Sequence, residues 1–101
     1  MMNIQKTFQD GVLTFELEGR LDSVTAPELE AAVNESINDA KAVVFDFTKL
    51  SYLSSAGLRI LLTSQQIMEE KELPDVTVRG ANAEIKGAFE VTGFNNLLNV
   101  E

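Results

Sequence analysis

The chain has 101 residues, 45% of them apolar and 24% charged, and its formal net charge at pH 7 is −8. This acidity argues against nucleic acid and anionic membrane surfaces as partners, because like charges repel. The sequence contains neither Cys nor His, which excludes thiolate metal sites and nucleophilic catalysis by a Ser–His or Cys–His pair. We therefore expect one domain over residues 1–101, with no metal, no cofactor and no catalytic residues.

The N-terminal segment predicts two antiparallel strands. Asp10-Gly11 is a strong hairpin signal between an extended segment around Ile4–Phe8 and residues 12–18. The second segment, VLTFELE, alternates apolar and polar residues, as expected for a strand with one buried face. No basic stretch followed by an apolar block is present here, so no signal peptide is expected. Together with the lack of Cys, this fits a reducing compartment, and we expect the cytoplasm.

A helix and a buried strand are expected next. The tetrapeptide TAPE, residues 25–28, has the spacing of a capping box with Pro in the first turn, and apolar residues continue at helical spacing to about residue 39. The run KAVVFDF, residues 41–47, is short and rich in β-branched and aromatic residues. It predicts a strand that is covered on both faces.

The stretch LSYLSSAGLR, residues 50–59, marks the start of a second helix that continues to about Lys71. Either Ser54 or Ser55 can cap this helix, since a serine oxygen accepts a hydrogen bond from a free N–H in the first turn. Gly57 lies inside that turn, where glycine costs up to about 1 kcal/mol relative to alanine. A helix retains glycine there for a reason, such as the close approach of another backbone or of a ligand.

The C-terminal part predicts a strand at residues 76–80, a helix capped by Asn82 and ended by Gly93, and a packed tail at residues 94–100. The predicted element order is β-β-α-β-α-β-α. Right-handed crossovers between parallel strands then give an α/β fold, with a mixed sheet of about four strands and helices packed mainly on one side.

Two motifs resemble the signatures of the STAS domain family, in particular of its anti-sigma factor antagonists. They are VVFDFTKLSYLSSAGLRILL, residues 43–62, and GRLDSVTAPELE, residues 19–30. The first is similar to the family's apolar strand, turn and serine-containing segment before Gly-Leu. The second is similar to the family's Gly-x-Leu-Asp landmark, which precedes a helix. The resemblance covers nearly the whole chain and implies a STAS-like fold.

The resemblance implies a binding protein that phosphorylation switches. In the family, the serine two positions before the glycine is the phosphoacceptor, which here is Ser55. Ser54 stands where the family often has Asp, and Ala56 where it often has Ser or Thr; Ser54 is an alternative acceptor. The family's loop aspartate, near the partner contact, corresponds to Asp22, although Asp22 has the simpler role of accepting hydrogen bonds from its own turn. The expected partner-binding residues are Asp22, Ser54, Ser55, Ala56, Gly57 and Arg59.

The implied partners are a GHKL-type serine kinase that is also an anti-sigma factor, and a PPM-type phosphatase that resets the switch. ATP then belongs to the kinase, and this chain is a substrate and binder, not an enzyme. A second reading is an adaptor subunit of a multiprotein complex, such as a lipid transporter, which acts by docking alone. A small-ligand regulator has less support, because no Gly-rich phosphate loop is present. The sequence does not specify the sigma factor, the stimulus or the oligomeric state.

Overall fold

The computed structural model describes residues 2–101 and contains a five-stranded mixed sheet. The first strand is antiparallel to the second, and the remaining strands run parallel to one another in the order β1-β2-β3-β4-β5. The strands are β1 (Met2–Gln9), β2 (Val12–Leu21), β3 (Ala42–Leu53), β4 (Thr77–Arg79) and β5 (Asn99–Val100). The predicted α/β fold and element order are confirmed, with the tail forming one short additional strand against β4.

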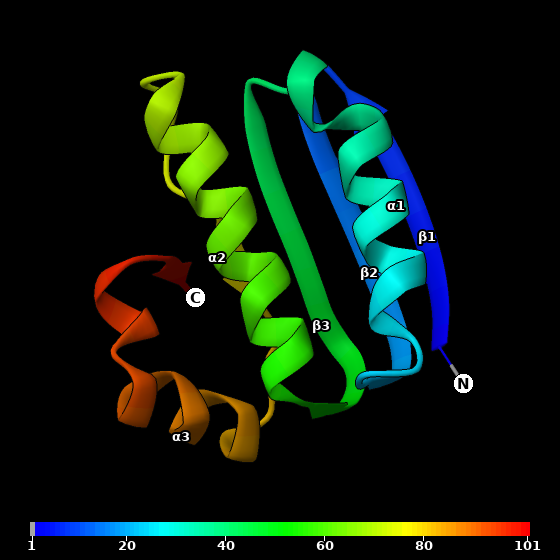
Figure 1. The fold of residues 1–101 in the computed structure, drawn as a ribbon. Coiled ribbons are helices and arrows are strands. Elements are labelled where there is room, and N and C mark those ends of the chain that lie inside the picture. The colour runs from blue at the N-terminus through cyan, green and yellow to red at the C-terminus, as the bar shows by residue number, and fades with distance from the viewer. Residues whose placement is uncertain (1) are drawn as a thin grey trace.

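Three helices connect these strands. They are α1 (Ala26–Ser36), α2 (Ser55–Glu70) and α3 (Ala83–Thr92), and short 3-10 turns follow α1 (Ile37–Asp39) and α3 (Phe94–Asn96). Figure 1 shows α1 and α2 side by side across one face of β1–β3, with α3 on the side of α2 that is away from α1. Gly93 ends α3 in the left-handed conformation, with φ of 80°, as its position predicts. Within residues 2–101, no helix is long and apolar enough to cross a membrane.

The core lies between the sheet and the helices. Alternate residues of β2 and β3 face the helices and are at most 1% exposed: Leu13, Phe15, Leu17, Val43, Phe45 and Phe47. The rings of Phe15 and Phe45 stack with their centroids 5.4 Å apart, which adds a specific contact to the area that they bury. The opposite face of the sheet carries polar residues such as Thr14 and the exposed Glu16. One face of the sheet is therefore core and the other is uncovered, so the prediction that residues 41–47 form a strand covered on both faces is wrong.

The strand β3 extends to Leu53, whereas the sequence predicted that it ends at Phe47. The register between β2 and β3 shifts between Glu16 and Glu18 and again between Gly19 and Arg20. Each irregularity interrupts the two-residue alternation of buried and exposed side chains, so the second half of β3 looks like a loop in the sequence. The extension carries β3 to the start of α2.

The buried side of α2 includes a polar side chain that the helical pattern did not indicate. Gln65 is 1% exposed, and its Oε1 accepts a hydrogen bond of 2.7 Å from the backbone N–H of Val76. Its Nε2 donates to Asp75 Oδ1 over 2.8 Å and to Glu69 Oε1 over 3.1 Å. These bonds satisfy a buried amide and tie α2 to the segment that leads into β4.

Gly57 provides a direct test of the packing beneath α2. A Cβ at this position would lie 2.8 Å from Leu21 Cγ and would also collide with Leu53 Cδ1. We expect Gly57→Ala to lower the free energy of unfolding by about 1–3 kcal/mol, because side chains in a packed core cannot move aside freely. Urea denaturation measures the change.

Gly87→Ala is the matched control for this substitution. Gly87 lies within α3, and a Cβ there meets no atom within 4 Å. We expect this variant to be more stable by about 0.5–1 kcal/mol, as for glycine replaced by alanine at an open helical site. Equal effects of the two substitutions would contradict the packing argument.

Candidate functional site

Two loops meet where β2 and β3 end. Leu21 and Leu53 are partners in the parallel pairing of these strands, and the backbone N–H of Ser54 donates to the Leu21 carbonyl over 2.9 Å. Asp22 directly follows Leu21, so the loop that holds Asp22 lies next to the start of α2. The structure thereby brings together the two sequence motifs, although α1, a 3-10 turn and β3 lie between Asp22 and Ser54 along the chain.

The two serines at the start of α2 have different environments. Ser54 is the N-cap, and its Oγ accepts a hydrogen bond of 3.2 Å from the backbone N–H of Ala56. Ser55 is the first residue of the helix and is exposed. Its hydroxyl has no hydrogen-bond partner among residues 2–101. The structure therefore assigns the capping role to Ser54 and leaves Ser55 accessible to solvent.

Asp22 organises its own loop through backbone hydrogen bonds. Its Oδ1 accepts from the N–H groups of Val24 over 3.0 Å and Thr25 over 3.1 Å, and its carbonyl accepts from Ala26 over 2.8 Å. The hydrogen bond from the Thr25 backbone lowers the pKa of Asp22 below its ordinary value, although partial burial of the carboxylate opposes the shift. Asp22 is thus held in its charged form at the edge of the site.

The predicted capping box at Thr25 and Glu28 is wrong. Thr25 makes no side-chain cap bond to α1; its hydroxyl donates to the Arg20 carbonyl over 2.8 Å and accepts from the Asp22 N–H over 2.9 Å. The side chain is buried and turned back into the loop, so its oxygen is not available to the first turn of the helix. Asp22 satisfies the N–H groups that precede α1 instead.

Arg20, Tyr52 and Val24 surround this loop and were not indicated by the sequence reading. The Arg20 guanidinium carbon lies 4.2 Å from the centroid of the Tyr52 ring, and Arg20 Nε lies 3.8 Å from Asp22 Oδ2. Val24 is 84% exposed. Arg20 stands inside the quoted Gly-x-Leu-Asp motif, but its contact with Tyr52 depends on the bulged pairing of β2 with β3, which the sequence pattern does not reveal.

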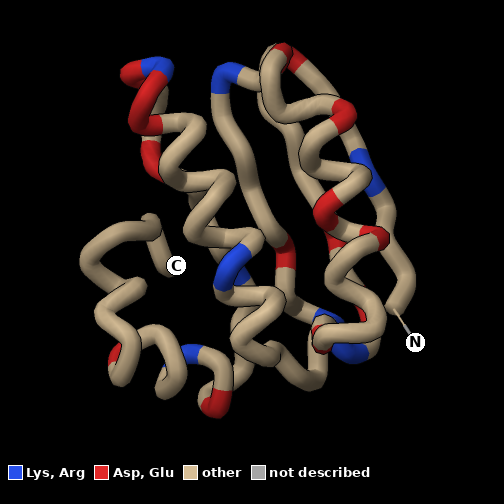
Figure 2. The backbone as a smooth tube through the Cα atoms, viewed as in Figure 1, with Lys and Arg blue, Asp and Glu red and all other residues tan. Residues whose placement is uncertain are grey.

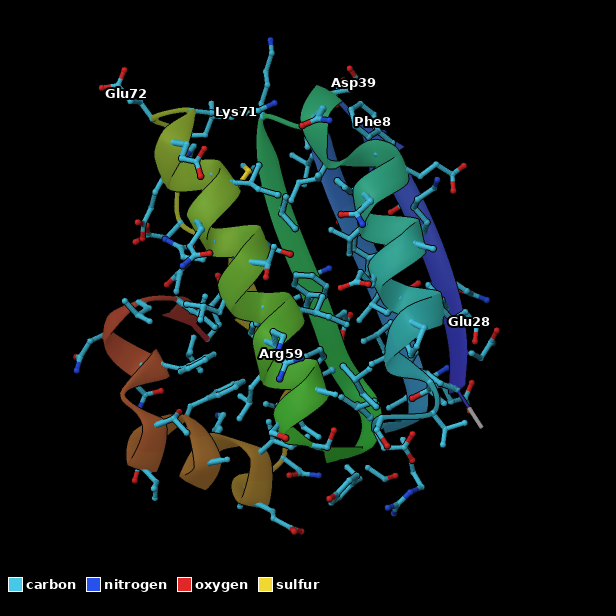
Figure 3. All side chains as sticks on the ribbon, viewed as in Figure 1. Phe8, Glu28, Asp39, Arg59, Lys71 and Glu72 are labelled. Carbon is cyan, nitrogen blue, oxygen red and sulfur yellow. The ribbon has the colours of Figure 1, made fainter. Side chains whose placement is uncertain are left out.

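A groove runs between the N-terminal ends of α1 and α2. Its volume is about 270 Å³, and it is lined by Ser23, Ala26, Pro27, Glu30, Ala56, Arg59 and Ile60. Figure 3 shows the Arg59 side chain on the outer surface of α2. Arg59 is exposed and forms no ion pair within the described part of the chain. Gly57 does not line this groove and is buried against Leu21 and Leu53.

The charges around this groove are unevenly distributed. Acidic residues predominate along α1 and at the far end of α2, and basic residues are few (Figure 2).

A second hollow, of about 170 Å³, lies on the uncovered sheet face between residues such as Gln5, Glu16 and Thr48, and none of the predicted site residues lines it. No group of three or more acidic side chains in residues 2–101 is placed to hold a metal ion.

The different roles of the two serines predict different effects on stability. We expect Ser54→Ala to lower the free energy of unfolding by about 1 kcal/mol, because it removes the N-cap acceptor of α2. Ser55→Ala is the matched control and should change stability by less than about 0.5 kcal/mol, as for an exposed surface position. Urea denaturation of both variants measures the difference, and a larger loss for Ser55→Ala would contradict the cap assignment.

The lowered pKa of Asp22 predicts a dependence of stability on pH. The charged carboxylate stabilises the fold above the unfolded pKa of 3.8, and this contribution is lost as the pH falls through the lower pKa of the folded state. We expect Asp22→Asn to be less stable than the wild type at pH 6, with the gap narrowing toward pH 3. Asp39→Asn, in an exposed turn, controls for net charge. A gap independent of pH would disprove the prediction.

Comparison with known proteins identifies relatives of this chain. Residues 3–101 match the model of the STAS domain. BtrV of Bordetella bronchiseptica, a candidate anti-sigma factor antagonist, is 31% identical over 93 residues, which cover 90% of this chain and 78% of BtrV. The solved structure of an anti-sigma factor antagonist from Mycobacterium paratuberculosis is 25% identical and has a TM-score of 0.83, covering 99% of this chain and 85% of that one.

A third comparison concerns the fold alone. The structure of SpoIIAA from Bacillus, in its phosphorylated form, has a TM-score of 0.79 at 16% identity, with 98% of this chain and 91% of that chain covered. The match of the family model over nearly the whole sequence, together with the BtrV identity, identifies the family. The chain belongs to the STAS domain family.

Proposed function

We propose that this protein is an anti-sigma factor antagonist and that phosphorylation of Ser55 switches its binding. The observation that carries the proposal is the placement of Ser55: exposed at the first position of α2, with the capping role taken by Ser54. The similarity to BtrV and to the Mycobacterium paratuberculosis antagonist supports it. SpoIIAA, which shares the fold, has itself been solved in a phosphorylated form.

The docking surface consists of the Asp22 loop, the start of α2 and the groove beside it. It comprises Asp22, Ser54, Ser55, Ala56 and Arg59, with Gly57 supporting the backbone from below. In the unmodified state this surface binds a GHKL-type serine kinase that holds a sigma factor, and the sigma factor is released. The chain acts by binding, in the cytoplasm, and performs no catalysis of its own.

Phosphorylation then reverses the docking. The kinase transfers the γ-phosphoryl group of ATP to the Ser55 oxygen, which releases ADP and the hydroxyl proton, and a PPM-type phosphatase later hydrolyses the ester. The phosphate adds about −1.5 to −2 charges next to Asp22, which is already negative. An uncompensated charge at an interface costs roughly 2–5 kcal/mol, which corresponds to about 30- to several-thousand-fold in affinity.

The binding test compares modified and unmodified protein. Candidate anti-sigma factor kinases are incubated with the protein, ATP and Mg²⁺, the modified residue is mapped by mass spectrometry, and dissociation constants are measured by calorimetry. We expect modification at Ser55, Ser55→Ala to bind like the wild type, and the Ser55 phosphoform to bind at least about 30-fold more weakly. Ser55→Asp should weaken binding in the same direction.

Ala83→Asp is the matched charge control. Ala83 is exposed and is the first residue of α3, directly after the N-cap Asn82, so it occupies the same helical position as Ser55 but on another helix. This variant should bind like the wild type. Equal affinities of the phosphoform and Ser55→Ala would refute the switch. Docking without any phosphoform would favour an adaptor that acts by binding alone.

A further inference from the structure

Arg59 lies one helical turn after Ser55. The two residues have the i, i+4 spacing in α2, and both are exposed. Residues with this spacing occupy the same face of a helix, with roughly 5–6 Å between their Cβ atoms. The arginine side chain is therefore long enough to reach a group attached to the Ser55 oxygen without any movement of the backbone.

Arg59 is the basic residue that the helical spacing places beside Ser55. Arg20 is engaged by the Asp22 carboxylate and the Tyr52 ring. Glu30 lines the same groove as Arg59 but forms no ion pair with it, and Asp22 adds a negative charge from the neighbouring loop. A phosphate at Ser55 would meet repulsion from two elements and attraction from Arg59.

We propose that Arg59 pairs with the phosphate on Ser55 and holds it as the dianion. The inference rests on the proposed modification of Ser55 and assigns a residue to its regulation. A guanidinium binds phosphate oxygens in a fork of N–H donors and stays charged at all relevant pH values. In the unmodified protein the same guanidinium is free to contact the partner.

The pairing has a definite effect on the charge of the switch. The second pKa of a phosphoserine lies near 6, so the phosphate titrates close to neutral pH. A nearby cation favours the more negative form and therefore lowers this pKa. Arg59 thus keeps the modified docking surface fully charged down to lower pH, against the opposing effects of Asp22 and Glu30.

The experiment titrates the phosphate directly. Phosphoserine is incorporated at position 55 during translation, so the sample does not depend on any kinase, and the ³¹P chemical shift is followed from pH 4.5 to 8 by NMR. The samples are the wild type, Arg59→Gln, Arg59→Lys and Lys71→Gln. Lys71 is the C-cap of the same helix, roughly 24 Å from Ser55 at 1.5 Å per residue, so its replacement removes an equal charge far from the phosphate.

We expect Arg59→Gln to raise the second pKa of the phosphate by about 0.3–0.6, the range for one charge near 5 Å in a water-like medium with and without screening by physiological salt. Arg59→Lys should remain close to the wild type, and Lys71→Gln should equal it. In 1 M NaCl the difference between Arg59→Gln and the wild type should shrink several-fold, because the Debye length is then about 3 Å. The same pKa in Arg59→Gln and the wild type would overturn the pairing. The titration needs no kinase, so an unchanged pKa would argue against the pairing but not against the proposed binding function. Conversely, failure to bind an anti-sigma factor kinase would argue against the proposed function but not against the pairing.

Discussion

The absence of a side chain at Gly57 is the constraint on which the site depends. Leu21 and Leu53 fill the space that a Cβ would occupy, and these two residues end the strands β2 and β3. The first turn of α2 can therefore lie directly on the strand ends, where Ser54 donates to the Leu21 carbonyl. One close contact in the core thus fixes the distance between the Asp22 loop and the serines.

This rigid support is compatible with the proposed switch, which works by charge. Asp22 is bound to the backbone of its own loop, and Ser54 is bound to the first turn of α2, so these two side chains are already held in place next to Ser55. Ser55 and Arg59 are both exposed and lie on one face of α2. Modification can alter the electrostatic potential of the surface while the backbone stays in place.

The sequence predicted the elements whose signals are local and periodic. The hairpin at Asp10-Gly11, the helix α2 and the stop of α3 at Gly93 follow from turn chemistry and helical spacing, and all are present. The family resemblance supplied the fold and drew attention to Ser55. These predictions depend on short-range preferences or on a known motif, which a single sequence contains.

The features that the sequence did not reveal depend on contacts between distant segments. The irregular pairing of β2 with β3 hides the second half of β3, and the two-residue strand β5 exists only because β4 offers it an edge. Thr25 looks like a helix cap, but the strand end at Arg20 provides a better partner for its hydroxyl. The glycine at position 57 suggested the close approach of another backbone or of a ligand, whereas the structure places the side chains of Leu21 and Leu53 there.

The uncovered face of the sheet also offers a place to attach a label. Thr7 of β1 is exposed and pairs with Thr14, on the side away from the helices and the groove. Since the chain contains no native cysteine, a Thr7→Cys variant carries a single thiol. A fluorophore or surface linker attached there leaves the groove between α1 and α2 accessible to a binding partner.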